Sequence, residues 1–217
     1  MKTFLRILVV SLGVSATSAY AEGFGVNVGG GTTGLVVDIV QKLSPNFDVR
    51  VGMQGLGYKI SYEYDNVDYD INQTMAIPEV LLDWRPMAGR FRISVGAAYY
   101  NNVGKLKAAP DPNTFYTIGN NTYLGSAIGN ISGKSSFHTG APYLGVGWDF
   151  FFGSKQDIGL ALNVGAFYRD RADVTLNSTQ EGVTPGLSSD LAVEAENIRG
   201  DLPKFHPAIN VGAAFRF

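Results

Sequence analysis

The final segment of the sequence constrains the fold most strongly, because its side chains alternate between two kinds. From Phe205 to Phe217 every second residue is apolar, and the residues between them are small or polar. A period of two is the pattern of a β-strand, whose successive side chains point to opposite faces. The apolar face ends in two aromatic residues, Phe215 and Phe217. The segment therefore predicts a strand with one apolar face and one small or polar face.

The same alternation recurs along the chain, in residues 35–40, 47–54, 79–85, 91–100, 143–150 and 158–169. A glycine-rich segment, 24–30, is a further candidate strand and is expected to turn at Gly31-Thr32-Thr33. It brings the count to about eight strands. A tilted strand crosses a bilayer in about 9–11 residues, and these apolar faces have that length. Mean hydropathy is +0.04, as expected when apolar and polar residues alternate.

Composition alone leaves a soluble β-protein and a membrane β-barrel in competition, and the aromatic residues separate them. They fall at the ends of the apolar faces: Phe47, Trp84, Phe91, Trp148, Phe150, Phe215 and Phe217 towards one rim, and Tyr99 and Tyr168 at the other. Aromatic rings gather at the two interfaces of a membrane, where one part of the ring is wet. A soluble sandwich has no reason for two such bands. The pattern predicts a closed antiparallel up-and-down transmembrane β-barrel.

The connections sort into short and long ones that alternate along the chain. Residues 44–46, 87–90 and 153–157 are short, 65–70 is intermediate, and 107–133 and 178–204 are long and polar. In bacterial outer-membrane barrels the short turns are periplasmic and the long loops extracellular. Both termini are then expected on the periplasmic side. Residues 188–200 begin with a serine and end with a glycine, which predicts a short, solvated surface helix.

The beginning of the sequence predicts a secretory signal peptide over residues 1–21. Lys2 and Arg6 precede a short apolar run, and Ala19-Tyr20-Ala21 matches a cleavage site. The barrel domain is then expected over residues 22–217. Within it, Pro78, Pro142 and Pro207 fall inside strand patterns. Proline removes a donor from the ladder, so each is expected at a bulge or at an outer strand end.

Four stretches resemble a proteobacterial family of small outer-membrane barrels with no assigned activity. They are Gly31–Leu35, Leu82–Pro86, Phe91–Gly96 and Ala141–Trp148. Together with the strand count, the aromatic bands and the final phenylalanine, the chain resembles barrels of the OmpA, OmpX and OmpW type. The resemblance implies integral insertion in the outer membrane of a Gram-negative bacterium, contact with its lipid and lipopolysaccharide, and recognition of Phe217 by the barrel-assembly machinery.

Charges of both signs recur on the inner strand faces: Asp38, Asp48, Arg50, Glu79, Asp83, Arg85, Arg92, Asp149, Arg169 and Arg216. An eight-stranded barrel has an interior only wide enough for side chains to fill. Buried charges must be paired and hydrogen-bonded. We therefore expect an ion-pair network that plugs the lumen, and a narrow conducting pore is the alternative.

Other chemistry has little support in the sequence. There is no cysteine, and no metal-ligand or nucleotide-binding motif, so no cofactor is expected. The net charge of −2 argues against nucleic acid. The two histidines, His138 and His206, do not form a recognisable catalytic set with a serine and an acid. The sequence predicts a monomeric, non-enzymatic barrel with a structural or interaction role. The alternatives are a narrow, porin-like channel for small or apolar solutes and a lipid-modifying enzyme using His138.

Overall fold

The computed structural model describes residues 23–64, 67–153, 155 and 157–217. The expected signal peptide, residues 1–21, lies outside the described residues. Within them, no helix is both long enough and apolar enough to cross a membrane.

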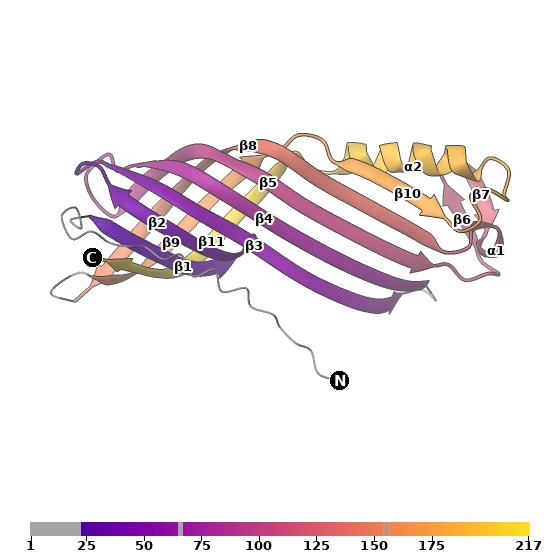
Figure 1. The fold of residues 1–217 in the computed structure, drawn as a ribbon, viewed down its shortest axis with the longest axis horizontal. Helices are drawn as coiled ribbons and strands as arrows, with labels where there is room; N and C mark the ends of the chain where they lie inside the picture. Colours follow the sequence, from indigo (N-terminus) through magenta and orange to yellow (C-terminus); the bar gives the residue numbers. More distant parts are fainter. Residues whose placement is uncertain (1–22, 65–66, 154, 156) are drawn as a thin grey trace.

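Eight antiparallel strands close into a barrel, in the order β1-β2-β3-β4-β5-β8-β9-β11 and back to β1 (Figure 1). Their bounds are β1 Phe24–Gly31, β2 Gly34–Lys42, β3 Phe47–Tyr64, β4 Val67–Trp84, β5 Phe91–Ala109, β8 Ile131–Phe152, β9 Ile158–Tyr168 and β11 Phe205–Arg216. The predicted fold, an antiparallel barrel of eight strands, is confirmed.

The glycine-rich first strand predicted over residues 24–30 is present. β1 turns into β2 through Thr32 and Thr33, and Gly34 enters β2 with a φ of +96°, a conformation that favours glycine. Glycine is also needed where β1 meets β11, because a Cβ on Gly29 would lie 2.6 Å from the Cα of Gly212. This close approach of the β1 and β11 backbones explains why β1, which closes the barrel against β11, is rich in glycine.

Four strands are longer than their apolar alternation predicts. β3, β4, β5 and β8 continue beyond the row formed by Gly55, Ala76, Asn101 and His138, which is level with the start of β2. We call residues 56–64, 67–75, 102–137 and 170–204 the extension. It includes β10 (Asp173–Ser178), which pairs with β8, the hairpin β6 (Phe115–Ile118) and β7 (Asn121–Leu124), α1 (Gly125–Ile128) and α2 (Leu187–Asp201). The segments predicted as long loops are thus largely folded (Figure 1).

The helix expected over residues 188–200 is α2, and it is solvated on one face and buried on the other. Leu187, Leu191 and Ala195 are buried. They pack against inward-facing side chains of β10 and against the β6–β7 hairpin. Asp190 is also buried and accepts hydrogen bonds from Tyr123 Oη and Asn121 Nδ2. The helix therefore covers the inner side of the extension.

The prolines do not mark bulges. The β3–β4 and β4–β5 registers are the same on both sides of Pro78, and only the β5 partners of Ile77 and Pro78 are missing from the ladder. Pro142 directly precedes the point where β8 begins to pair with β9. Pro207 lies beyond the end of the β1–β11 pairing, as expected for an outer strand end. The missing donors are accommodated by local gaps in pairing rather than by an inserted residue.

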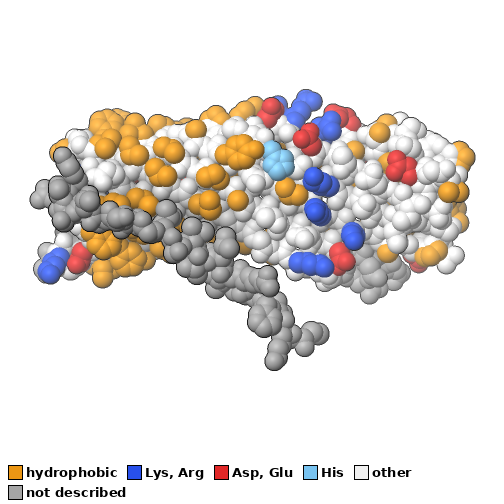
Figure 2. Space-filling model, in the orientation of Figure 1, with side chains coloured by type: hydrophobic (Ala, Val, Ile, Leu, Met, Phe, Trp, Pro, Cys, Tyr) orange, Lys and Arg blue, Asp and Glu red, His pale blue; other side chains and the backbone are white. Residues whose placement is uncertain are grey.

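The outer surface of the barrel is apolar over the half that carries the short turns. Figure 2 shows this belt of hydrophobic side chains and a band of charged ones where it ends. The predicted apolar faces point outward, as in Leu144, Val164 and Ile209, which are exposed. We call the remainder of the barrel, outside the extension, the belt half.

Aromatic side chains mark both edges of this belt. At the edge near the short turns, Phe47 is opposite Trp84 and Phe91 is opposite Trp148. Phe150, Phe215 and Phe217 also lie near these turns, and the Phe217 ring centroid is 6.0 Å from that of Phe24. At the other edge, Tyr99 is exposed and Tyr168 packs on Phe205 with their ring centroids 5.3 Å apart. The aromatic residues therefore form two bands about the apolar belt.

Candidate functional site: the charged lumen

Arg50 on β3 crosses the lumen, and its guanidinium contacts side chains on four other strands, β2, β4, β5 and β9. Its guanidinium lies 3.4 Å from the Asp38 carboxylate and 3.1 Å from the Asp83 carboxylate. It also donates to Asn163 Oδ1 on β9 at 3.1 Å. All four residues are buried. Because β3 and β9 lie on opposite sides of the ring, these contacts fill the space between them.

Arg85 and Arg92 share a second centre, the carboxylate of Asp149 on β8. Arg85 Nη2 lies 2.5 Å from Asp149 Oδ2, and Arg92 Nη1 lies 2.9 Å from Asp149 Oδ1. Arg85 also bonds Asp48 at 2.7 Å, and Arg92 approaches Asp83 at 3.4 Å. Arg92 is only 1% exposed. The structure thus brings three guanidiniums into one network, in which Arg92 connects the Asp83 and Asp149 centres.

The network contains more acid than base. Five buried carboxylates, Asp38, Asp48, Glu79, Asp83 and Asp149, accompany the three guanidiniums, an excess of two negative charges when all are ionised. Glu79 has no salt bridge among the described residues and accepts a hydrogen bond from Gln54 Nε2 at 2.8 Å. Asp38 Oδ1 and Glu79 Oε1 have no hydrogen-bond partner among them. Negative charge is therefore least compensated next to β2 and β4.

Two arginines expected in the network lie apart from it. Arg169 is buried higher in the lumen, where it donates to Tyr100 Oη at 3.1 Å and lies 4.0 Å from the Phe137 ring centroid. Arg216 is exposed at the mouth of the barrel, with its guanidinium 3.5 Å from the Phe151 ring centroid. Neither has a salt bridge among the described residues. Strand alternation gave the correct side for Arg169, but not its depth or its surroundings.

Above the charged network the lumen is filled by aromatic and aliphatic side chains. Tyr100 and Phe167 are fully buried, with ring centroids 6.2 Å apart, and Tyr143 packs on Phe167 at 4.8 Å. Ile77 and Leu81 belong to the same cluster. Sequence reasoning placed Tyr100, Tyr143 and Phe167 on inner faces but did not recognise a second, apolar plug. The sequence pattern that indicates this plug is the presence of large aromatic residues at inward-facing positions where most other residues are small.

Comparisons with known proteins agree with this architecture. The sequence matches no protein-family model, and no curated protein sequence matches it. The solved structure of CarO from Acinetobacter baumannii is 25% identical with a TM-score of 0.65, over 89% of this chain and 97% of that one. CarO2 from the same species is 24% identical with a TM-score of 0.68, over 89% and 98%. A major outer membrane protein from Thermus thermophilus is 17% identical with a TM-score of 0.49, over 89% and 98%.

CarO is an outer-membrane barrel of eight strands. This protein, too, lies in the outer membrane. The apolar belt is then its lipid-facing surface. Much of the charged network lies level with the aromatic band near the short turns, because Asp48, Arg85, Arg92 and Asp149 each directly follow an aromatic residue of that band. A network of buried charges is compatible with that position because the strands keep it away from the hydrocarbon.

A cavity of about 720 Å³ opens at the end of the barrel that carries the short turns. Its walls include Lys42, Arg216 and Phe217 near the mouth, and Arg92 and Asp149 of the network. The lumen is therefore an open vestibule on this side, and the charged network bounds it. In the described residues, no group of three or more histidine, cysteine, aspartate or glutamate side chains is arranged to hold a metal ion.

The two histidines lie in different surroundings. His138 is exposed on the outer face of β8, opposite Asn101, and no described carboxylate or hydroxyl is hydrogen-bonded to it. His206 faces inward, with its ring centroid 5.5 Å from that of Tyr100 and its Nε2 without a partner among the described residues. They are thus on opposite sides of the barrel wall.

Proposed function

We propose that this protein is a non-enzymatic outer-membrane barrel with a closed lumen, whose biological contacts are made by the extension. The observation that carries the proposal is the path of Arg92. Its guanidinium reaches Asp83 on β4, Asp149 on β8 and Asn163 on β9, and so connects the walls of the lumen. The apolar plug formed by Tyr100, Tyr143 and Phe167 closes the same path a second time.

Single-channel recording in planar bilayers tests the closed lumen. The purified protein is expected to give no regular conductance steps, and Arg92→Ala is expected to give none either, because the aromatic plug stays in place. Combining Arg92→Ala with Phe167→Ala and Tyr100→Ala should open a path. Regular steps from the unmodified protein would contradict the proposal.

A narrow channel is the second candidate, and the vestibule of about 720 Å³ favours it. An open vestibule that ends on charged side chains is the form expected of a channel with a movable barrier. In that case Arg216, which stands at the mouth, would contact entering ions. Arg216→Glu should then change the ion selectivity of any conductance, whereas it should have no such effect in a closed barrel.

The non-enzymatic part of the proposal rests on His138. A lipid-hydrolysing site needs a histidine that is hydrogen-bonded to a nucleophile and oriented by a third group. The described surroundings of His138 supply neither. Release of fatty acid from phospholipid or lipid A vesicles, lost in His138→Ala, would overturn this part.

We further propose that the extension lies outside the cell and the short turns lie in the periplasm, as the lengths of the connections suggest. The chain has no cysteine, so single cysteines report on topology. A membrane-impermeant maleimide should label Val183→Cys on intact cells and should label Lys155→Cys only after the outer membrane is opened. We also propose that the barrel-assembly machinery contacts Phe217. Phe217→Ala is expected to lower the amount of this protein that is inserted into the outer membrane.

A further inference from the structure

A row of lysines crosses the outer face of the extension. Strand register places five exposed residues side by side on β3, β4, β5, β8 and β10: Lys59, Asn72, Lys105, Lys134 and Thr175. We call this set the lysine row. Figure 2 shows that charged side chains gather in a band where the apolar belt ends. Cationic side chains thus follow the curved sheet just beyond the lipid-facing surface.

The lysines of this row form no salt bridge with the described residues, although acidic side chains lie in the same charged band (Figure 2). Lys105 lies directly opposite Lys134, and like charges in that position destabilise a sheet. An unfavourable pair at the centre of a surface row gains stability when an anion binds between the two ammonium groups.

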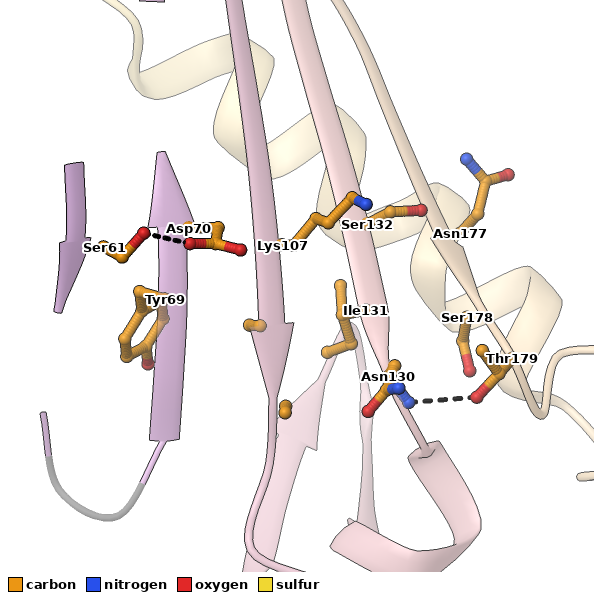
Figure 3. A pocket seen from close by; sticks show the side chains of 12 residues that line it. Ser61, Tyr69, Asp70, Lys107, Asn130, Ile131, Ser132, Asn177, Ser178 and Thr179 are labelled. Atoms are coloured by element: carbon orange, nitrogen blue, oxygen red, sulfur yellow. Dashed lines mark hydrogen bonds between the residues drawn. The ribbon is translucent and has the colours of Figure 1, made fainter. Parts of the chain in front are cut away.

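A hollow with both polar and apolar walls adjoins the row. The next set of paired positions on the same face is Ser61, Asp70, Lys107, Ser132 and Asn177, and these residues line a cavity of about 860 Å³ (Figure 3). Lys107 extends towards Ser132 and away from Asp70, whose carboxylate accepts a hydrogen bond from Ser61 (Figure 3). The hollow therefore offers one ammonium group with hydroxyl and amide groups, beside the Asp70 carboxylate and the apolar Ala108, Ala109 and Ile131. Hydroxyl and amide groups are donors and acceptors that suit sugar hydroxyls, and apolar side chains can pack on the faces of sugar rings.

The height of the row matches the headgroup layer of the membrane. Lys105 and Tyr99 lie on the same face of β5, six residues apart, and Tyr99 belongs to the aromatic band at the belt edge. At about 3.3 Å per residue and a strand tilt near 40°, this separation is about 15 Å along the barrel axis. Aromatic bands mark the interface with the hydrocarbon, so the lysines lie in the layer of phosphates and sugars above it.

We propose that the lysine row binds the phosphate groups of lipopolysaccharide in the outer leaflet, and that the hollow around Lys107 receives the adjoining sugars. Lysine binds phosphate as a point charge and needs no fixed geometry. This inference rests on the proposed orientation, with the extension outside the cell. It does not depend on whether the lumen conducts.

The sign of a stability change tests the proposal. In detergent without lipopolysaccharide, Lys105→Gln removes the repulsion with Lys134, so the unfolding midpoint is expected to stay the same or rise. In the presence of bisphosphorylated rough lipopolysaccharide the same variant should have a lower midpoint than the unmodified protein. Binding should weaken by about fivefold for each of Lys105 and Lys134 replaced by glutamine.

Three comparisons decide what is bound. Lys155→Gln, which removes an exposed lysine in the short turn between β8 and β9, should leave binding unchanged. Dephosphorylated lipopolysaccharide should bind the unmodified protein and the double variant equally. Millimolar inorganic phosphate should not displace lipopolysaccharide. Three results would each overturn the proposal. One is an equal loss of lipopolysaccharide binding in Lys155→Gln, and another is a difference in binding between the unmodified protein and the double variant that persists with dephosphorylated lipopolysaccharide. The third is displacement of lipopolysaccharide by free phosphate.

Orientation and binding are tested apart from each other, because detergent solutions give the protein access from all sides. The maleimide experiment could place Val183 in the periplasm while the purified protein still prefers phosphorylated lipopolysaccharide. The proposed orientation would then be wrong, and the lysine row would be a phosphate site that does not meet lipopolysaccharide in cells. That result would overturn the inference for the cell. Correct orientation with no such preference would overturn the site alone.

Discussion

The belt half and the extension share four strands, β3, β4, β5 and β8, but they differ in where their charged side chains lie. In the belt half, aliphatic residues such as Leu144 and Val164 face outward, and Arg92 and Asp149 are buried inside. In the extension, Leu191 and Ile118 are buried inside, and Lys105 faces outward. The surroundings explain the difference. Lipid stabilises apolar side chains on the outside and leaves the charges to pair within, whereas water around the extension requires an apolar core.

The largest expected effect tests the inside of the belt half. Arg92→Ala leaves the Asp83 and Asp149 carboxylates short of one compensating charge, so the free energy of unfolding should fall by about 3–5 kcal/mol. Urea titration in lipid vesicles measures it. Adding Asp149→Asn should restore part of the loss. Arg216→Ala, which removes an arginine without a described salt bridge, is the matched control and should cost at most about 1 kcal/mol. A mild loss in Arg92→Ala together with new conductance would favour a hydrated channel.

The inside of the extension should respond to the loss of apolar volume instead. Leu191 is 2% exposed and packs with Ile118, Ile128 and Leu187. Leu191→Ala should cost about 2–5 kcal/mol. The cost should be local, because the cluster around Leu191 lies wholly within the extension. Hydrogen exchange should show faster opening of α2 with little change in β9 or β11. The exposed Asn197, replaced by alanine, is the control on the same helix. Equal loss of protection throughout the barrel would show that the two halves unfold together.

The outer surfaces of the two halves give the third comparison. Val164 faces lipid on β9, and Val164→Arg should cost about 2–4 kcal/mol if it lies near the midplane. Thr175→Arg places the same side chain on the outer face of the extension and should change stability by no more than about 0.5 kcal/mol. The inward-facing neighbour of Val164, Gly165, is unsuitable as a control position, because a Cβ there would lie 2.7 Å from the Leu144 carbonyl oxygen. Similar costs at residues 164 and 175 would place the boundary of the belt elsewhere.

The smallest expected effect is the response of the extension to acid. The hydrogen bonds donated by Tyr123 and Asn121 lower the pKa of Asp190 below its ordinary value. Because the pKa is lowered, the ionised Asp190 carboxylate stabilises the docking of α2. This stabilisation is fully present above about pH 4, the ordinary pKa range of an aspartate, and is lost as the pH falls through the folded-state pKa. Exchange protection of α2, corrected for intrinsic rates, should therefore weaken in acid. Asp190→Asn should remove that dependence, and an unchanged pH profile in this variant would contradict the assignment.

The strands of the belt half and the faces of their residues could be predicted from the sequence, because the alternation is enforced on every strand by lipid on one side and a narrow lumen on the other. The extension could not. Apart from Val103, residues 56–61 and 102–109 carry polar or small side chains on their outer face, so the apolar signal stops although the strands continue. The buried side of α2 was missed for a related reason. Leu187, Leu191 and Ala195 form a narrow apolar stripe among charged residues, and that pattern is typical of many surface helices.

Which side of each strand faces lipid follows from the sequence alone, because that choice depends only on a residue's parity within its strand. Parity also selects the charges that enter the lumen. Which of those charges meet depends on the folded barrel, since pairing is set by the depth of each residue along the barrel axis and by the stagger between strands. Register brings Arg92 to Asp149 but places Arg169 beside Tyr100, among rings and above the network. The same register, on the outer face, sets Lys105 opposite Lys134.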